Sequence, residues 1–273
     1  MNKRFTNALA IGILWLAAGV TVAMLGALLL YVFVNGIGVI SPAFIFTWPH
    51  GVNSEGGIWP TIVATVYVTA LAMLISTPVS VLAAVYLAEY AHQGRIVDTI
   101  RFAADSLASV PSIVMGLFGF ALFVEATGLG LSMISAALAL SLLMLPIIMR
   151  ATEEAIRSVP KYMRWGSYGL GATKWQTVSR IVLPAAAPRI ITGIVLAMGR
   201  AVGETAVVLY TMGQAVFLPI SPLDSGRPMT VHLYLLAVDG INLPTAFGTA
   251  LLLIVMILGF NLSARLILRL RKV

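Results

Sequence analysis

Six long intervals with almost no charged residues constrain the fold of this chain more than any other feature. They cover about 8–34, 59–87, 106–124, 131–149, 190–213 and 243–264. A helix that crosses a bilayer needs about 20 mostly apolar residues, because lipid cannot hydrogen-bond to its backbone. The sequence therefore predicts an all-α membrane protein in which residues 1–273 form one domain with six transmembrane helices.

Composition excludes several other classes of protein. Only 10% of the residues are Asp, Glu, Lys or Arg, against about 25% in soluble domains. The net charge of +7 does not indicate nucleic-acid binding, because the basic residues are spread between the apolar intervals. The chain has no cysteine, and His50, His92 and His232 lie far apart, so we expect no metal site.

The Lys and Arg residues of the connecting segments predict the orientation. They gather at the N-terminus, after the second and fourth intervals and after the sixth, whereas the other connections hold only Arg227. The basic residues on the first side are Lys3, Arg4, Arg95, Arg101, Arg150, Arg157, Lys161, Arg164, Lys174, Arg180, Arg189, Arg265, Arg269, Arg271 and Lys272. Because basic loops stay in the cytoplasm, both termini are expected there.

The first interval could be confused with a signal peptide, because Lys3 and Arg4 precede it. Its apolar stretch is about twice the usual 7–15 residues of such a segment. We therefore expect a retained transmembrane helix. On the opposite side of the membrane, residues 44–59 are rich in Gly, Pro and aromatic residues and predict a compact loop anchored by Trp48 and Trp59.

The longest cytoplasmic segment, about 150–189, predicts two short helices joined at glycines. Gly169 and Gly171 end the first helix. Thr173 and Gln176 then have the spacing of a capping box, in which each residue satisfies a backbone donor of the other.

This segment also carries a motif. Gly171 is followed by nine residues and then by Ile181-Val182-Leu183-Pro184. It resembles the second half of the cytoplasmic loop of binding-protein-dependent ABC-importer permeases, which reads Glu-Ala-Ala, three residues, Gly, nine residues, Ile-x-Leu-Pro. The resemblance implies a type I, MetI-like architecture whose coupling helices sit in a groove on an ATP-hydrolysing subunit. Where that family has Glu-Ala-Ala, this chain has Trp165-Gly166-Ser167. We expect Arg164, Trp165 or Lys174 to replace the acidic contact.

Further segments resemble the phosphate branch of that family, the PstA-type permeases. They are Gly56-Gly57-Ile58, Tyr86-Leu87-Ala88-Glu89-Tyr90, 110–119, Thr152-Glu153-Glu154-Ala155-Ile156 with Val159-Pro160, and 199–206. The resemblance implies a multi-pass subunit of the bacterial cytoplasmic (inner) membrane. Its implied partners are a homologous second permease of the PstC type, an ATPase dimer of the PstB type and an extracytoplasmic phosphate-binding protein of the PstS type.

The chain is not expected to be an enzyme. It contains no Gly-x-x-x-x-Gly-Lys-Ser/Thr segment that would cradle ATP phosphates. No cofactor is expected in this chain, and ATP and Mg would be bound by the partner ATPase.

Arg200 is the one basic residue well inside a predicted span, where a charge costs about 2.5–3.5 kcal/mol on insertion scales. Glu204 follows four residues later, which predicts an ion pair on one helix face. The pair either holds helices together or lines a solute path. If the pair lines a solute path, Arg200 would attract an oxyanion and Glu204 would hold Arg200 in place. Glu204 would also accept a hydrogen bond from the O–H group that phosphate carries and sulfate lacks. Thr205 would add a neutral hydrogen bond.

Gly199 and Gly203 form a small-x-x-x-small pattern beside this pair. Small residues let transmembrane helices approach closely, so this face is expected to pack either on a second permease or within the chain.

Three alternatives remain open from the sequence. The first is a permease for another oxyanion such as sulfate, molybdate or phosphonate. The second is a phosphate transporter driven by an ion gradient without an ATPase. The third is a membrane scaffold or sensor that transports nothing.

Overall fold

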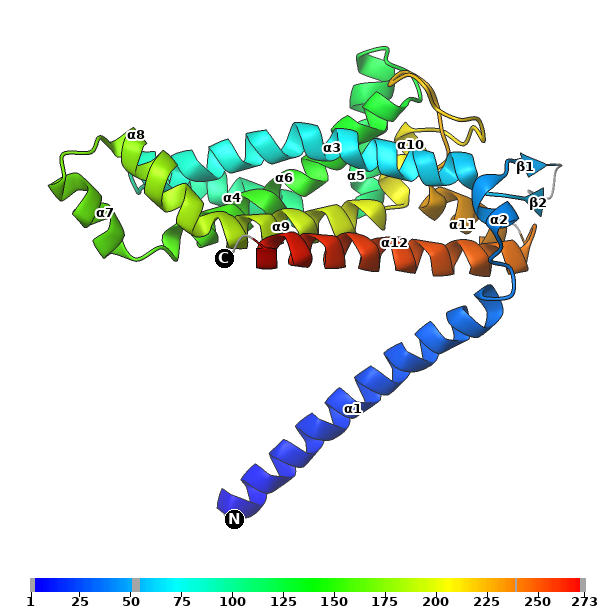
Figure 1. Ribbon diagram of the computed structural model, residues 1–273, viewed down its shortest axis with the longest axis horizontal. Coiled ribbons are helices and arrows are strands. Elements are labelled where there is room, and N and C mark those ends of the chain that lie inside the picture. Colours follow the sequence, from blue (N-terminus) through cyan, green and yellow to red (C-terminus); the bar gives the residue numbers. More distant parts are fainter. Residues whose placement is uncertain (1–2, 51–54, 239, 271–273) are drawn as a thin grey trace.

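The computed structural model describes residues 3–50, 55–238 and 240–270, and it shows an elongated helical bundle (Figure 1). In this part of the chain, five helical stretches are long and apolar enough to cross a membrane, and a bent pair makes a sixth. The long helices are α1 (Lys3–Gly36), α3 (Trp59–Val85), α6 (Met133–Arg157), α9 (Leu183–Val202) and α12 (Leu243–Leu270). The predicted all-α class with six apolar spans is confirmed.

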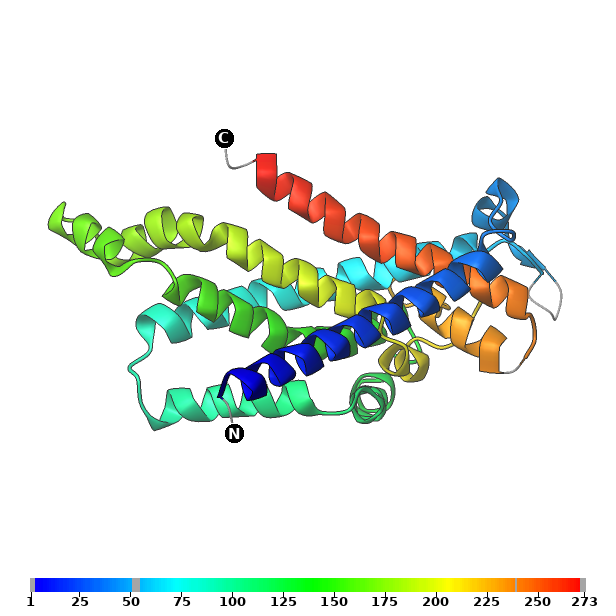
Figure 2. The ribbon, with the colours of Figure 1, turned by 90° about the horizontal axis from the view of Figure 1, so that it is seen from below.

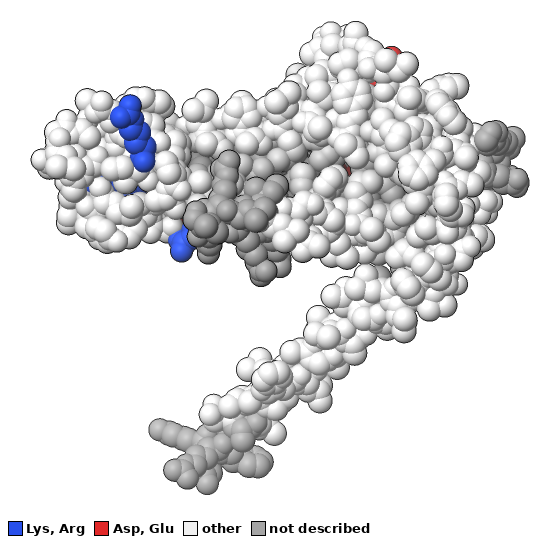
Figure 3. Space-filling model, viewed as in Figure 1, with Lys and Arg blue, Asp and Glu red and all other residues white. Residues whose placement is uncertain are grey.

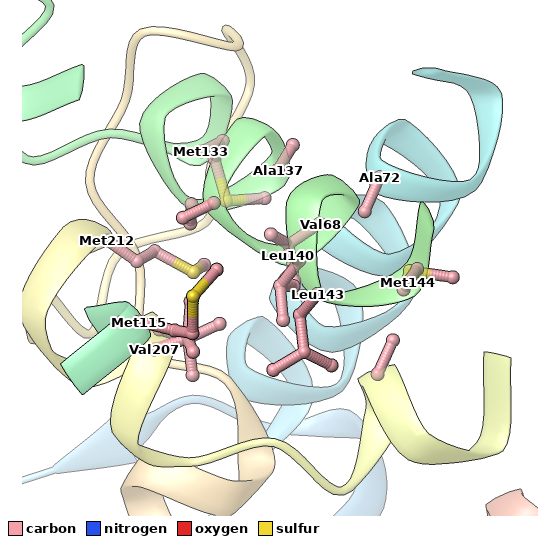
Figure 4. Packing of buried hydrophobic residues seen from close by; sticks show 14 of the residues in the cluster. Val68, Ala72, Met115, Met133, Ala137, Leu140, Leu143, Met144, Val207 and Met212 are labelled. Atoms are coloured by element: carbon pink, nitrogen blue, oxygen red, sulfur yellow. The ribbon is translucent and has the colours of Figure 1, made fainter. Parts of the chain in front are cut away.

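The core lies where α3, α5 (Ser112–Gly119), α9 and α10 (Ala206–Thr211) surround α6. Figure 4 shows Met133, Leu140 and Met144 of α6 interleaved with side chains from these helices. Gly193 of α9 lies directly against Ala151 of α6, so the two backbones cross closely. Because small residues permit this approach, α6 and α9 form a firm pair, and side chains that both helices present to one side stay aligned.

The third predicted span, 106–124, is not one continuous helix. Helix α4 (Arg95–Ser109) and the α5 helix with its π-helical extension η2 (Phe120–Ala126) meet at an angle of 101°. Val110 and Pro111 are extended at the break. A residue before proline is driven away from the helical region, and proline suits a helix start, so the chain turns here. The charged helix α4 then lies along the cytoplasmic half of the bundle (Figure 2).

The fifth predicted span, 190–213, is also interrupted. Helix α8 (Lys174–Thr177), the π-helix η3 (Val178–Val182) and α9 form one helical run that stops at Val202. The Gly203 N–H is bonded to the carbonyls of Gly199 and Ala201, which closes the last turn. A short α10 follows from Ala206. Apolar composition continues across the break, and for this reason hydropathy alone predicts one span.

Two other helices extend further than predicted on the cytoplasmic side. Helix α6 continues to Arg157 and α12 to Leu270, whereas the apolar intervals end near 149 and 264. A helix that leaves the membrane keeps its hydrogen bonds in water, so the end of the apolar stretch does not mark the end of the helix. Of the C-terminal basic residues, Arg271 and Lys272 lie outside the described residues.

The segment opposite the cytoplasmic end is compact, as predicted for residues 44–59. It contains α2 (Pro42–Phe46) and the antiparallel pair β1 (Pro49–His50) and β2 (Glu55–Gly56), and residues 51–54 lie outside the described part. The Trp59 ring packs against that of Phe46, with 5.7 Å between the ring centroids. On this side, α11 (Met229–Val238) leads into α12.

The cytoplasmic tip contains the two short helices that the glycines predict. Helix α7 (Lys161–Gly169) ends before Gly171, whose φ of +79° suits glycine. The Thr173 hydroxyl then accepts from the Gln176 N–H, and the Gln176 side chain accepts from the Thr173 N–H, so the predicted capping box is confirmed. This tip is at one end of the long axis, beyond the membrane-length helices (Figure 1).

Candidate functional site

Arg200 lies in the last turn of α9 and faces an open groove of about 440 Å³. The groove runs between α6, α9 and α12 and is lined by Ile147, Leu196, Gly199, Arg200, Ile257 and Asn261. Its walls are mostly apolar, so Arg200 supplies the single formal charge among the lining residues. The helix C-terminus carries partial negative charge, which favours a cation in this turn.

The predicted ion pair between Arg200 and Glu204 is wrong. Because α9 ends at Val202, Glu204 lies outside the helix and is not one helical turn from Arg200 on the same face. Among the salt bridges of the described residues, none joins these two side chains within 4.0 Å. The Glu204 backbone carbonyl instead accepts a hydrogen bond from the Thr230 hydroxyl at 2.9 Å, which ties the break to α11.

Thr205 is placed by the same break. It is half-buried and precedes α10, where its backbone carbonyl accepts from the Leu209 N–H at 2.9 Å. The structure therefore keeps Arg200, Glu204 and Thr205 in one short stretch, but on a helix end and a loop rather than on a helix face.

The two glycines beside this stretch do not pack tightly on another helix of the chain. An added Cβ at Gly199 would have Asn261 Nδ2 as its neighbour at 3.8 Å, and one at Gly203 would meet only backbone of its own helix. Close packing within the chain is thus not seen at these positions. The contact with a second permease stays a prediction.

The cytoplasmic tip exposes a set of large apolar side chains. Leu170 is 91% exposed, Trp165 68% and Trp175 61%, and Tyr162 and Tyr168 of α7 are exposed as well. Basic residues are the charged groups of this segment, since no Asp or Glu occurs between Glu154 and Glu204. Figure 3 shows basic side chains at this end and a nearly uncharged surface along the bundle face in view. An exposed apolar cluster outside the membrane is typical of a protein-docking surface.

Arg164 is held within the chain, and its contact with an ATPase stays a prediction. Its Nη2 lies 2.6 Å from a carboxylate oxygen of Glu89, and it also donates to the carbonyls of Ile156 and Val159. The Arg164 side chain is only 16% exposed and that of Glu89 only 9%. Arg164 therefore fastens α7 to the π-helix η1 (Tyr86–Tyr90).

Lys174 also contacts the second span. Its Nζ lies 4.9 Å from the centre of the Tyr90 ring, within the range of a cation–π interaction. Trp165 and Gly171 remain exposed, as a docking surface needs. The tip is thus linked mechanically to α3 through both Glu89 and Tyr90.

Residues 76–272 match the family described as binding-protein-dependent transport system inner membrane component. The chain belongs to that family.

Relatives of this transport-system component are similar over most of its length. A probable ABC transporter permease protein, YqgI of Bacillus subtilis (strain 168), is 38% identical over 97% of this chain and 96% of its own. The phosphate transport system permease protein PstA 1 of Mycobacterium tuberculosis (strain ATCC 25618 / H37Rv) is 38% identical over 81% of this chain and 74% of its own. The phosphate transport system permease protein PstA of Haemophilus influenzae (strain ATCC 51907 / DSM 11121 / KW20 / Rd) is 32% identical over 99% and 96%.

Solved structures share the fold of this inner membrane component. A chain of a bacterial ABC transporter involved in the import of the acidic polysaccharide alginate has a TM-score of 0.68 and 15% identity, over 98% of this chain and 99% of that one. A chain of the MetNI methionine ABC transporter, in an inward-facing conformation, has a TM-score of 0.62 and 21% identity, over 78% and 93%. The predicted MetI-like architecture is confirmed.

One group of charged residues in this transport-system component has no counterpart in the sequence-based prediction. Glu153 of α6 is almost buried and accepts from Arg101 of α4 at 2.7 Å and from Arg157 at 2.8 Å. Arg150 pairs with Asp105 of α4. Spacing along α6 identifies the pairs on that helix, but the pairs with α4 join residues 45 and 52 positions apart, so no local pattern indicates them.

Proposed function

We propose that this chain is the permease subunit of an ATP-driven phosphate importer and forms half of the path for inorganic phosphate. The observation that carries the proposal is Arg200, a guanidinium on an open groove within a membrane-spanning helix. Relatives named as phosphate transport permeases supply the substrate class.

The groove favours an oxyanion on physical grounds. A guanidinium stays charged at every relevant pH and donates two parallel hydrogen bonds to an oxyanion. No carboxylate of the described residues neutralises Arg200, so it has donors available for a solute. Glu204 would act on the solute rather than on Arg200, accepting the O–H that phosphate carries and sulfate lacks.

The proposal includes three partners. The exposed tip around Trp165 would dock on an ATPase dimer that binds ATP and Mg, and this chain would not hydrolyse ATP itself. A homologous second permease would complete the path, and an extracytoplasmic binding protein would deliver phosphate. The assembly would lie in the cytoplasmic (inner) membrane. The family description, which names a binding protein and an inner membrane, supports this composition.

Reconstitution in liposomes tests the proposed function. The complex purified with this chain is expected to accumulate labelled phosphate only when ATP is on the ATPase side and the binding protein is on the other. Excess sulfate should not compete. Uptake without ATP would favour the gradient-driven transporter, and equal competition by sulfate, molybdate or phosphonate would favour another oxyanion. If a complex that hydrolyses ATP takes up no phosphate, the result would favour the membrane scaffold or sensor.

The docking surface leads to a separate prediction. Trp165→Ala is expected to lower phosphate uptake and the amount of ATPase that co-purifies by about 10-fold or more, because a central aromatic anchor commonly contributes 2 kcal/mol or more to an interface. Quantitative co-purification from membranes measures the effect. Trp15→Ala is the matched control, because Trp15 is 76% exposed on α1 and lies away from the tip. Unchanged ATPase recovery with Trp165→Ala would contradict the proposed docking surface.

A further inference from the structure

A second groove lies on the cytoplasmic side of the Arg200 groove, between two of the same three helices, α6 and α9. Its volume is about 330 Å³. The residues that line it come from α6 and α9 and are Ala151, Glu154, Ala155, Arg189, Thr192, Gly193 and Leu196. Leu196 lines both grooves, so they are neighbours on one surface of the α6–α9 pair.

The basic residues of the two grooves lie on the same face of α9. Arg189 precedes Arg200 by eleven residues, which corresponds to about 16 Å along the axis and a rotation within roughly 20° of three full turns. On α6, Ile147 and Glu154 have the same kind of spacing. The close contact between Gly193 and Ala151 holds the two helices together between the two ends. One row of side chains therefore connects the two guanidinium groups.

The middle of this row is apolar. Leu196 is 67% exposed and Ile147 lies beside it in the Arg200 groove. We call Leu196 and Ile147 the apolar waist. An ion finds no hydrogen-bond partner at the waist, whereas each end of the row offers a guanidinium. On α9, Arg189 is the next basic residue on the cytoplasmic side of Arg200.

Arg189, like Arg200, presents a guanidinium to an open groove. Arg189 is exposed, and in the part of the chain that the structure describes no carboxylate forms an ion pair with it within 4.0 Å. The Thr192 hydroxyl, one turn away, donates to the Pro188 carbonyl at 2.9 Å, so its oxygen is an acceptor, and Glu154 supplies a second acceptor on the facing helix. The cytoplasmic groove thus combines a guanidinium donor with a carboxylate that accepts from a protonated oxyanion, whereas Arg200 is the single charged residue that lines the other groove.

We propose that Arg189, Thr192 and Glu154 form a second oxyanion subsite, which receives phosphate after it has passed the apolar waist at Leu196. This proposal rests on the proposed function and adds a release position on the cytoplasmic side. In this arrangement the anion moves between two guanidinium groups rather than from one guanidinium directly into water.

Cysteine labelling tests the subsite without requiring transport, because the chain contains no cysteine. Thr192→Cys is introduced into the assembled complex, and the rate of its reaction with a negatively charged thiol reagent is followed by the mass of this chain. Inorganic phosphate is expected to slow the reaction several-fold. The added change Arg189→Gln should abolish this protection, while Arg180→Gln, which removes an exposed guanidinium outside the groove, should leave it in place. Ile96→Cys, 78% exposed on α4 and outside both the groove and the tip, should react at the same rate with and without phosphate.

Two results would overturn the subsite: no effect of phosphate on Thr192→Cys, or protection that persists with Arg189→Gln. Equal slowing at Ile96→Cys would show an effect of phosphate on the reagent and would also count against the subsite. The proposed function fails differently, through loss of ATP-driven uptake by the unmodified complex, so the two failures are distinguishable.

Discussion

Arg200→Gln is expected to reduce ATP-driven phosphate uptake by about 100-fold. Hydrogen bonds to a charged group contribute about 1.5–3 kcal/mol, and glutamine keeps a polar amide but is shorter and loses the charge and the two parallel donors. The groove offers no other charged residue to compensate, because its remaining lining residues are Ile147, Leu196, Gly199, Ile257 and Asn261. The measurement is the initial rate of labelled phosphate uptake into liposomes at saturating ATP and binding protein.

The control for this prediction separates transport from assembly. Arg180→Gln removes an exposed guanidinium of the cytoplasmic segment and is expected to retain nearly full uptake. Arg200→Lys should lie between the two, because lysine keeps the charge without the planar fork. The Arg200→Gln complex should still contain the ATPase, since Arg200 lies far from the tip. Undiminished uptake by Arg200→Gln would rule out a path past this residue.

Glu153→Ala is expected to lower the stability of the chain by about 3 kcal/mol, or roughly 6–12 °C in the thermal unfolding midpoint. The Glu153 side chain is only 4% exposed and accepts from both Arg101 and Arg157, with Arg150 at 3.9 Å. Its removal leaves these guanidinium groups close together without a common acceptor. The midpoint is measured on the purified complex in detergent, by intrinsic fluorescence.

Asp98→Ala is the matched control for Glu153. Asp98 pairs with the same Arg101 at 3.4 Å, but its side chain is 72% exposed. Exposed pairs contribute about 0.2–1 kcal/mol, so the midpoint should change by no more than roughly 4 °C. Equal shifts for the two variants would mean that burial of Glu153 does not strengthen the α4–α6 contact.

Features that depend on local sequence could be predicted. Apolar length locates the spans, because a helix in lipid satisfies its backbone within the segment whatever surrounds it. The capping box at Thr173 and the left-handed Gly171 depend only on neighbouring residues, and both are confirmed. The position of Arg200 on an apolar helix follows from the same reasoning.

Features that depend on contacts between residues far apart in the sequence could not be predicted. The ion pair of Arg164 with Glu89 joins residues 75 positions apart, so the sequence offers no reason to prefer it over docking. The helix ends at Val202, so Glu204 does not share a helix face with Arg200. The residues around this break are apolar enough that the sequence suggested one continuous span. Pro111 indicates a helix start or a kink, but the angle of 101° is set by how α5 packs on α10 and α6.

Helix α1 contacts the bundle only near its end, where Gly36 lies against Phe247 and the Tyr31 ring meets the Phe247 ring at 5.5 Å (Figure 1). Its apolar part, Leu9–Gly36, has 28 residues. At 1.5 Å per residue this stretch is about 42 Å long, whereas the hydrocarbon layer is about 30 Å thick. An upright α1 would leave roughly two turns of apolar side chains among headgroups and water. The excess length is accommodated by a steep tilt or by local thickening of the bilayer, so the thickness of the surrounding lipid helps to set the angle at which α1 leaves the bundle.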